Sequence, residues 1–192
     1  RISGIVGNLL SFARQTDEED EEVAIGTVID EAVALIKHQF LKDGIQLAIY
    51  IEQGLPAVRA NAQQLQQVFL NLLSNARYAL NQRYPGKHEG KQLEVKSRLI
   101  SLERQPYVRT TVTDYGTGIQ EEIINHIFKP FYSMKKPGEG TGLGLSISHG
   151  LVKDFNGFLW VDSKLNQYTT MTVDLPAVRS RSESAPERDE SR

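Results

Sequence analysis

Cysteine is absent from the 192-residue sequence. Disulfide bonds, thiolate nucleophiles and cysteine-ligated zinc are therefore excluded, and we expect a cytoplasmic setting because nothing points to an oxidising compartment. Long apolar runs are also absent: stretches such as Leu47 to Ile51 are far shorter than the ~20 residues that cross a bilayer. We expect this chain to be soluble, which leaves open a membrane-anchored parent protein.

A dominant charge of one sign is absent too. The 22 Lys and Arg residues nearly balance the 24 Asp and Glu residues, for a formal net charge of -2. Such a chain has no general attraction to nucleic acid or to an anionic membrane, so we expect no nucleic acid partner. Any phosphate ligand must be held by a local site.

The sequence divides into one domain of ordinary size and shorter flanking segments. Residues 1–16 carry an apolar helical stripe, which predicts a helix that packs on a partner helix. The acidic run 17–22 is interpreted as a solvated linker rather than a functional acidic patch. Residues 23–177 should form the domain, and 178–192 should be disordered. Because the chain begins at Arg1 within a helical pattern, we expect a fragment of a longer protein.

Hydrophobic periodicity predicts an α+β fold, a two-layer sandwich with a mixed, mostly antiparallel sheet covered on one face by helices. The predicted helices are 28–40 with Thr27 as its cap, 62–84, 119–127 and 145–155. The predicted strands are 23–27, 45–51, 93–101, 107–114, 157–162 and 169–175.

Amide side chains line the edge of the predicted helix 62–84. Gln67, Asn71 and Asn75 follow one another at spacings of four residues, beside the apolar stripe. An Asn carbonyl oxygen suits Mg²⁺, and its NH₂ group can hold a phosphate oxygen or a water. From this helix alone, a solvated polar face remains an equal alternative.

A carboxylate and two glycines follow a predicted strand. Asp114 ends the strand, and Gly116 and Gly118 would let the backbone approach a ligand closely. A carboxylate there can accept a hydrogen bond from an exocyclic amine, which favours adenine over guanine. The pattern is weak alone, since turns after strands often look like this.

Alternating glycines lead into the predicted helix 145–155. The run from Gly138 to Leu145 predicts a phosphate cradle of backbone N–H groups backed by a helix N-terminus. It is not a P-loop, because no Gly-Lys-Ser or Gly-Lys-Thr follows. Lys135 and Lys136 precede it, and we expect at least one of them to contact phosphate.

Together, four motifs resemble the N, G1, F and G2 boxes of sensor histidine kinases of two-component systems. They are NLLSNA at 71–76, DYGTGI at 114–119, FKPFYSMK at 128–135 and GTGLGLSI at 140–147. These kinases lie in the GHKL superfamily with DNA gyrase, heat-shock chaperone and mismatch-repair ATPases. The resemblance implies the Bergerat ATP-binding fold, with ATP between the helices and a mobile lid, and an N-terminal remnant of a dimerisation-hairpin helix.

The resemblance also assigns roles to residues. It implies that Asn75 binds Mg²⁺, that Asn71 supports the phosphates and metal-bound waters, and that Asp114 reads the adenine amine. Phe128 and Phe131 would anchor the lid, and Lys135 would join Asn71 in the catalytic set. The remaining implied contacts to ATP come from Gly116, Gly118, Ile119, Gly140, Thr141, Gly142, Leu143 and Gly144.

Asn71 bears on the reaction that the resemblance implies. In hydrolytic members of the superfamily, a glutamate base precedes the metal-binding asparagine by four residues, and an amide cannot act as that base. The resemblance therefore implies a protein histidine kinase, a homodimer when complete. It would donate the ATP γ-phosphoryl group to a histidine on a dimerisation hairpin, for relay to an Asp of a response-regulator receiver domain.

Some family features are missing or altered. None of His38, His88, His126 and His149 fits the acceptor motif, so we expect residues 1–16 to end the second hairpin helix and this chain alone not to autophosphorylate. Tyr78 stands where many members have lysine, and Lys135 could replace that contact.

Two alternatives within the resemblance stay open: a GHKL ATPase switch module and an anti-sigma-type serine kinase. The form FYSMK and the small Ala79 resemble the nitrogen-regulator-like branch of the histidine kinases.

Overall fold

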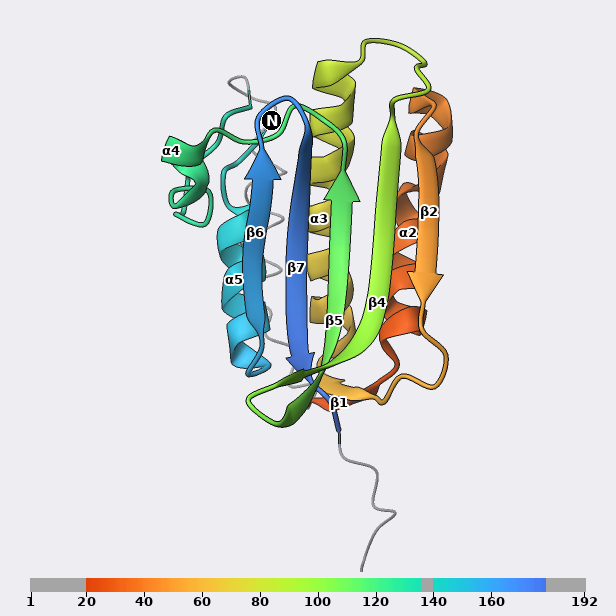
Figure 1. Ribbon diagram of the computed structural model, residues 1–192, viewed down its shortest axis with the longest axis vertical. Helices are drawn as coiled ribbons and strands as arrows, with labels where there is room; N and C mark the ends of the chain where they lie inside the picture. The colour runs from red at the N-terminus through yellow and green to blue at the C-terminus, as the bar shows by residue number, and fades with distance from the viewer. Residues whose placement is uncertain (1–19, 136–139, 179–192) are drawn as a thin grey trace, which may run out of the picture.

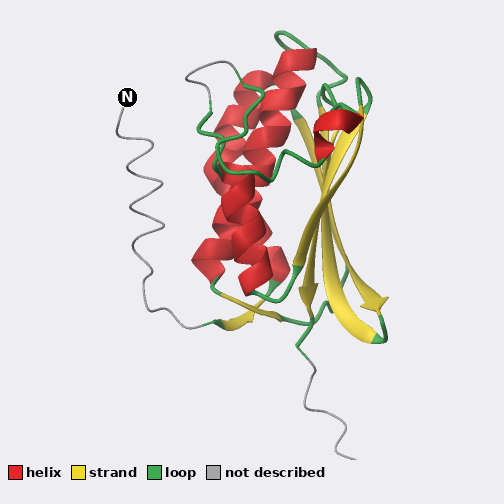
Figure 2. Ribbon diagram, turned by 90° about the vertical axis from the view of Figure 1, so that its left-hand side faces the viewer, coloured by secondary structure: helices red, strands yellow, loops and turns green. Residues whose placement is uncertain are grey.

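The computed structural model describes residues 20–135 and 140–178. Its main sheet is covered by helices on one face (Figure 2). The expected hairpin remnant 1–16, Lys136 and all but the first residue of the expected tail 178–192 lie outside the described residues. The two layers confirm the predicted fold class.

The sheet has five strands in the order β2-β4-β5-β7-β6 (Figure 1). Only β2 and β4 run parallel; the other neighbours are antiparallel. This topology places Asp114, the last residue of β5, opposite Thr169 of β7. The bounds are β2 Gln46–Ile51, β4 Gln92–Leu102, β5 Gln105–Asp114, β6 Phe158–Lys164 and β7 Tyr168–Pro176.

Three helices cover the sheet: α2 Ile25–Asp43, α3 Ala62–Arg83 and α5 Gly144–Asp154. The predicted apolar stripe of α3 is the centre of the core, and every member is at most 3% exposed: Leu65, Val68, Phe69, Leu72, Leu73, Ala76 and Leu80. Burying each of the larger side chains contributes about 1.5–3 kcal/mol. Within the described ranges, no helix combines the length and apolarity that crossing a bilayer requires.

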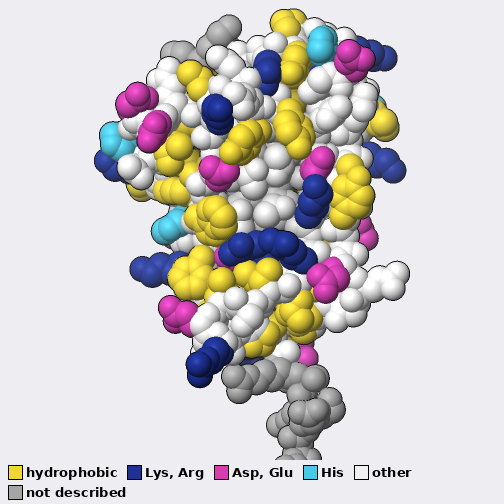
Figure 3. All heavy atoms as spheres, viewed as in Figure 1, with side chains coloured by type: hydrophobic (Ala, Val, Ile, Leu, Met, Phe, Trp, Pro, Cys, Tyr) yellow, Lys and Arg dark blue, Asp and Glu magenta, His cyan; other side chains and the backbone are white. Residues whose placement is uncertain are grey.

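The opposite face of the sheet is open and mixes charged with hydrophobic side chains (Figure 3). Its most buried charge is Asp174, which is 2% exposed. Arg109 donates to both carboxylate oxygens, at 2.7 and 2.8 Å, and the Trp160 indole N–H donates to one at 3.3 Å. The carboxylate is thus fully paired without help from the helix layer.

The N-terminal part of the domain differs from expectation. Strand β1, Glu21–Val23, pairs with β3, Val58–Ala60, so the last acids of the expected linker 17–22 belong to a strand. Both acids stay exposed, while Val23 is buried and fixes the register. The strand β3 was not predicted, because three residues carry too little periodicity.

Helix α2 begins earlier than predicted. Its N-cap is Ala24 and not Thr27, which lies in the first helical turn. Ile25 is 2% exposed, so burial of this side chain outweighs the preference for a hydroxyl cap. The helix extends to Asp43, and its C-cap is Gly44, whose φ is 70°.

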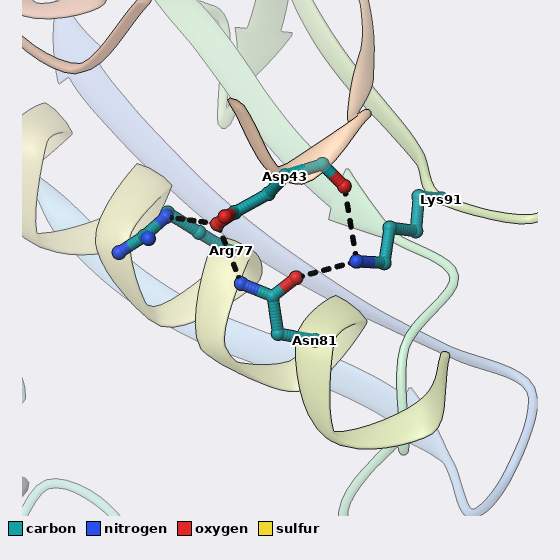
Figure 4. A network of polar contacts seen from close by, with 4 residues as sticks. All are labelled: Asp43, Arg77, Asn81 and Lys91. Atoms are coloured by element: carbon teal, nitrogen blue, oxygen red, sulfur yellow. Dashed lines mark hydrogen bonds and ion pairs between the residues drawn. The ribbon is translucent and has the colours of Figure 1, made fainter. Parts of the chain in front are cut away.

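A buried polar network joins α2, α3 and the start of β4 (Figure 4). Lys91, 1% exposed, donates to the Asp43 carbonyl at 3.0 Å and to Asn81 Oδ1 at 2.6 Å. Asp43 Oδ2 accepts from Arg77 and Asn81, each at 2.6 Å. Burial alone would raise the pKa of Asp43, but these hydrogen bonds outweigh it and lower that pKa. The network links α3 to the end of α2 and to the residue that precedes β4.

Candidate functional site

A cavity of about 860 Å³ lies between α3, the C-terminal end of β5, α5 and the segment that precedes α5. It brings together most of the residues predicted from the sequence. Those that line it are Asn71, Asn75, Asp114, Gly118, Ile119, Lys135, Gly140, Thr141, Gly142 and Gly144. Four predicted residues are not on the lining: Gly116, Phe128, Phe131 and Leu143.

Asp114 forms one end of the cavity. It is 5% exposed and accepts a hydrogen bond from the Gly116 N–H at 2.9 Å. Burial raises the pKa of its carboxyl to about 7, although the Gly116 hydrogen bond acts in the opposite direction. Few other groups stabilise the ionised carboxylate, so a hydrogen-bond donor on a bound ligand would stabilise it.

The two glycines after Asp114 permit close backbone packing. A Cβ on Gly116 would lie 2.6 Å from the backbone of Ala79 on α3, so this glycine shapes the wall from behind the lining. Gly118 has a φ of 63°, and a Cβ there would collide with the carbonyl of Lys164, the last residue of β6. Only glycine fits at either position.

The other end of the cavity is the start of α5. Helix α5 begins at Gly144, and the first N–H groups of a helix lack intrahelical partners, so they can bind an anion. Gly142, with a φ of 69°, packs so closely on the backbone of Phe131 that its Cβ would lie at 2.5 Å. The glycine run thus gives a cavity wall made of backbone.

Lys135 reaches across the cavity to α3. Its Nζ donates to Asn75 Oδ1 at 2.9 Å and lies 4.9 Å from the ring centroid of Tyr78. The ammonium group therefore occupies the neighbourhood of Tyr78, where many members of the resembling family have lysine. In this structure the Asn75 carbonyl already faces a cation.

Asn71 connects α3 with α5. Its Nδ2 donates to the Gly144 carbonyl at 2.7 Å and to Ser148 Oγ at 3.1 Å. A carbonyl only accepts, so this contact fixes which end of the amide faces α5. Both amide hydrogens are thereby directed to α5, and the predicted NH₂ contact to a phosphate stays a prediction. Asn71 Oδ1 can still accept from a water.

The two lid phenylalanines behave differently. Phe128 is half-buried, with its ring 5.2 Å from the His149 ring on α5. Phe131 is 77% exposed, so the expectation that its side chain anchors the lid is wrong for this structure. Its φ of 64° turns the side chain outward, and its backbone instead abuts Gly142. The nearby helix α4, Glu121–Ile124, is also shorter than the predicted 119–127.

The lining residues that sequence reasoning missed include two from β7. Thr169 and Met171 line the cavity from β7. Their place depends on the pairing of β5 with β7 across more than fifty residues, for which the sequence carries no local signal. Hydrophobic alternation in the predicted strand 169–175 could have indicated only which of its residues face the helices.

The profile of the family described as "Histidine kinase-, DNA gyrase B-, and HSP90-like ATPase" matches residues 60–179. Sensor kinase CckA of Brucella abortus is 33% identical over 199 residues, which cover 97% of this chain and 20% of that protein. Sensory histidine kinase/phosphatase NtrB of Rhizobium leguminosarum is 32% identical over 191 residues, which cover 95% of this chain and 48% of that protein.

Among solved structures, the catalytic domain of histidine kinase ThkA superposes with a TM-score of 0.68 at 26% identity. That comparison covers 83% of this chain and 97% of the ThkA domain. The chain therefore corresponds in extent to an isolated catalytic domain, and it spans half or less of the length of these two relatives.

Proposed function

Because this chain belongs to the family of histidine kinase-, DNA gyrase B- and HSP90-like ATPases, we propose that it is the ATP-binding catalytic domain of a sensor histidine kinase. In this proposal it donates the γ-phosphoryl group of ATP to a histidine on a dimerisation hairpin. The phosphoryl group then passes to an Asp of a response-regulator receiver domain. The relatives named as sensor kinases over nearly the whole chain favour this function.

The observation that carries the proposal is the arrangement of the cavity ends. A buried carboxylate, Asp114, lies at one end, and the glycine-lined start of α5 lies at the other, with Lys135 and Asn75 beside it. Asp114 would accept a hydrogen bond from the adenine amine, and backbone N–H groups near Gly144 would bind phosphate oxygens. One cavity would thus hold both parts of ATP.

The contacts of Asn71 support phosphoryl donation over hydrolysis. An amide whose hydrogens go to Gly144 and Ser148 does not remove a proton from water. The acceptor would be a histidine ring nitrogen that attacks the γ-phosphorus in line, while the bond to the β–γ bridging oxygen breaks and ADP leaves. Lys135 would neutralise charge on the transferring group.

Magnesium is part of the proposal, since Mg²⁺ supplies charge neutralisation on ATP. No group of three or more His, Cys, Asp or Glu side chains suits a metal within 20–135 and 140–178. The site fits an ion held mainly by phosphate oxygens and waters, with Asn75 Oδ1 as the protein ligand. That oxygen already faces the Lys135 ammonium group, so it is oriented toward positive charge.

Radiolabel transfer tests this function. The chain is mixed with [γ-³²P]ATP, Mg²⁺ and a separately produced dimerisation hairpin, and we expect label on the hairpin. A hairpin with its acceptor histidine changed to glutamine should stay unlabelled. The chain with Asn75→Ala should keep its fold by circular dichroism, lose Mg-ATP affinity in calorimetry and transfer no label.

ATP hydrolysis without transfer to the hairpin would contradict the proposal. An ATPase switch module would release inorganic phosphate at about 1 per second or faster with the hairpin unlabelled. Unchanged Mg-ATP affinity in the Asn75→Ala chain would reject Asn75 as the metal ligand.

A further inference from the structure

Arg83, the last residue of α3, is not among the residues that line the cavity. It contacts the loop that follows Asp114. Its Nη1 donates to three backbone carbonyls: Tyr115 at 3.1 Å, Gly116 at 3.0 Å and Gln167 at 3.1 Å. Two of these belong to the loop directly after Asp114, and the third belongs to the β6–β7 turn. The end of α3, the end of β5 and this turn lie at the same end of the molecule (Figure 1).

Three carbonyl oxygens around one nitrogen repel one another unless a donor stands between them. A guanidinium nitrogen supplies hydrogens and positive charge together, and such charge-assisted bonds are about twice as strong as neutral ones. Arg83 therefore draws the loop and the turn against the end of α3.

Other contacts close the same arrangement. The Asn166 N–H donates to the Thr117 carbonyl at 2.7 Å, and the Ile119 N–H donates to Ser163 Oγ at 2.9 Å. The loop is thus tied to β6 and the β6–β7 turn, and the Arg83 side chain ties it to the end of α3. The Gly116 N–H that bonds Asp114 Oδ1 lies within this loop.

From these contacts we propose that Arg83 is a positioning residue for base recognition. It holds the loop from Tyr115 to Gly118 so that the Asp114 carboxylate keeps the place from which it would read an exocyclic amine. The inference rests on the proposed function, because it assumes an adenine nucleotide with its base at Asp114. It adds a residue that the four sequence motifs do not contain.

The test compares Arg83→Gln with Arg77→Gln. Both residues lie on α3 and carry a guanidinium, but Arg77 bonds Asp43 on α2 and not the loop. We expect Arg83→Gln to weaken ADP binding in calorimetry about tenfold, while Arg77→Gln stays within about twofold. GDP, whose base has a carbonyl where adenine has the amine, should bind the wild type and Arg83→Gln with nearly equal weakness. The preference for ADP over GDP should therefore fall.

Hydrogen exchange without nucleotide gives a readout that does not require binding. Arg83→Gln should speed exchange at the amides of Gly116 and Asn166, with α2 and the centre of α3 unchanged. If Arg83→Gln does not fold, Arg83→Lys is measured in its place, since its shorter side chain cannot reach all three carbonyls.

Two results would overturn the inference while leaving the proposed function intact: ADP affinity within twofold of wild type in the Arg83 variant, or an equal loss for ADP and GDP. A wild-type chain that bound no ADP would instead refute the proposed function, and with it the premise for Arg83.

Discussion

The buried carboxyl of Asp114 predicts that nucleotide affinity depends on pH near neutrality. Burial raises its pKa to about 7 in the nucleotide-free chain, so close to half of the molecules are protonated there at pH 7. A protonated carboxyl has lost the charge that strengthens a hydrogen bond from the adenine amine. Binding therefore favours the ionised form and releases a proton below this pKa.

The size of the effect follows from linkage. With a pKa of about 7, the apparent affinity falls roughly twofold at pH 7 and roughly elevenfold at pH 6, relative to the fully ionised chain. Between pH 8 and pH 6 we therefore expect about a tenfold loss, or about 1.4 kcal/mol. The slope should approach one logarithmic unit of affinity per pH unit at the acidic end.

Isothermal calorimetry with ADP measures this dependence, and Asp114→Asn is the matched control. Phosphate groups also titrate near pH 6, but they do so equally for both chains. The ratio of the two affinities therefore isolates Asp114. A ratio that stayed constant from pH 6 to pH 8 would refute either the raised pKa or the contact of Asp114 with the base.

The same shift has a consequence for stability. The folded-state pKa of Asp114 lies above its value of 3.8 in the unfolded chain, so the folded state holds the extra proton between those values. Its contribution to stability is complete below about pH 4 and is lost as pH rises through about 7. Urea unfolding without nucleotide should show a steeper decline over this range in the wild type than in Asp114→Asn.

Three substitutions test other parts of the structure. Lys91→Met leaves two partly buried acceptors without their donor and should lower the free energy of unfolding by about 2 kcal/mol in urea titration. The change Lys37→Met at an exposed position should cost less than about 0.5 kcal/mol. Asn71→Asp places a carboxylate against the Gly144 carbonyl, so ADP affinity should fall about tenfold with no gain in phosphate release; unchanged affinity would contradict the link between α3 and α5. Gly142→Ala forces a Cβ onto lid backbone at a φ of 69° and should weaken ATP binding at least tenfold by calorimetry; wild-type affinity would show that the lid packs differently in solution.

Much of the fold could be predicted because its signals are local. The stripe of α3 and the amides beside it follow directly from helical periodicity. Asp114 and its glycines were found because a strand end followed by Gly residues is a local pattern. These elements are long or marked by glycine, and the structure places them within one or two residues of expectation.

The misses share a different cause. Strands β1 and β3 have three residues each. The β4 and β5 strands were predicted but extend closer to each other, to a turn at Glu103 and Arg104 with φ values of 49° and 67°, where glycine or asparagine would signal a turn. Phe131 likewise takes a left-handed backbone that its residue type does not suggest. Packing from distant segments decides such positions.

Helix α3 connects these observations, because three of its polar residues support different parts of the cavity. Asn71 fixes the start of α5, Asn75 meets Lys135, and Arg83 holds the loop after Asp114. From the first to the last of these positions the helix advances about 18 Å. The buried apolar stripe fixes the rotation of this helix on the sheet. A change that rotated α3 would therefore disturb both ends of the cavity, the end at Asp114 and the end at α5, together. For this reason, a change in packing far from the nucleotide should alter nucleotide affinity even though every group that touches the nucleotide is unchanged.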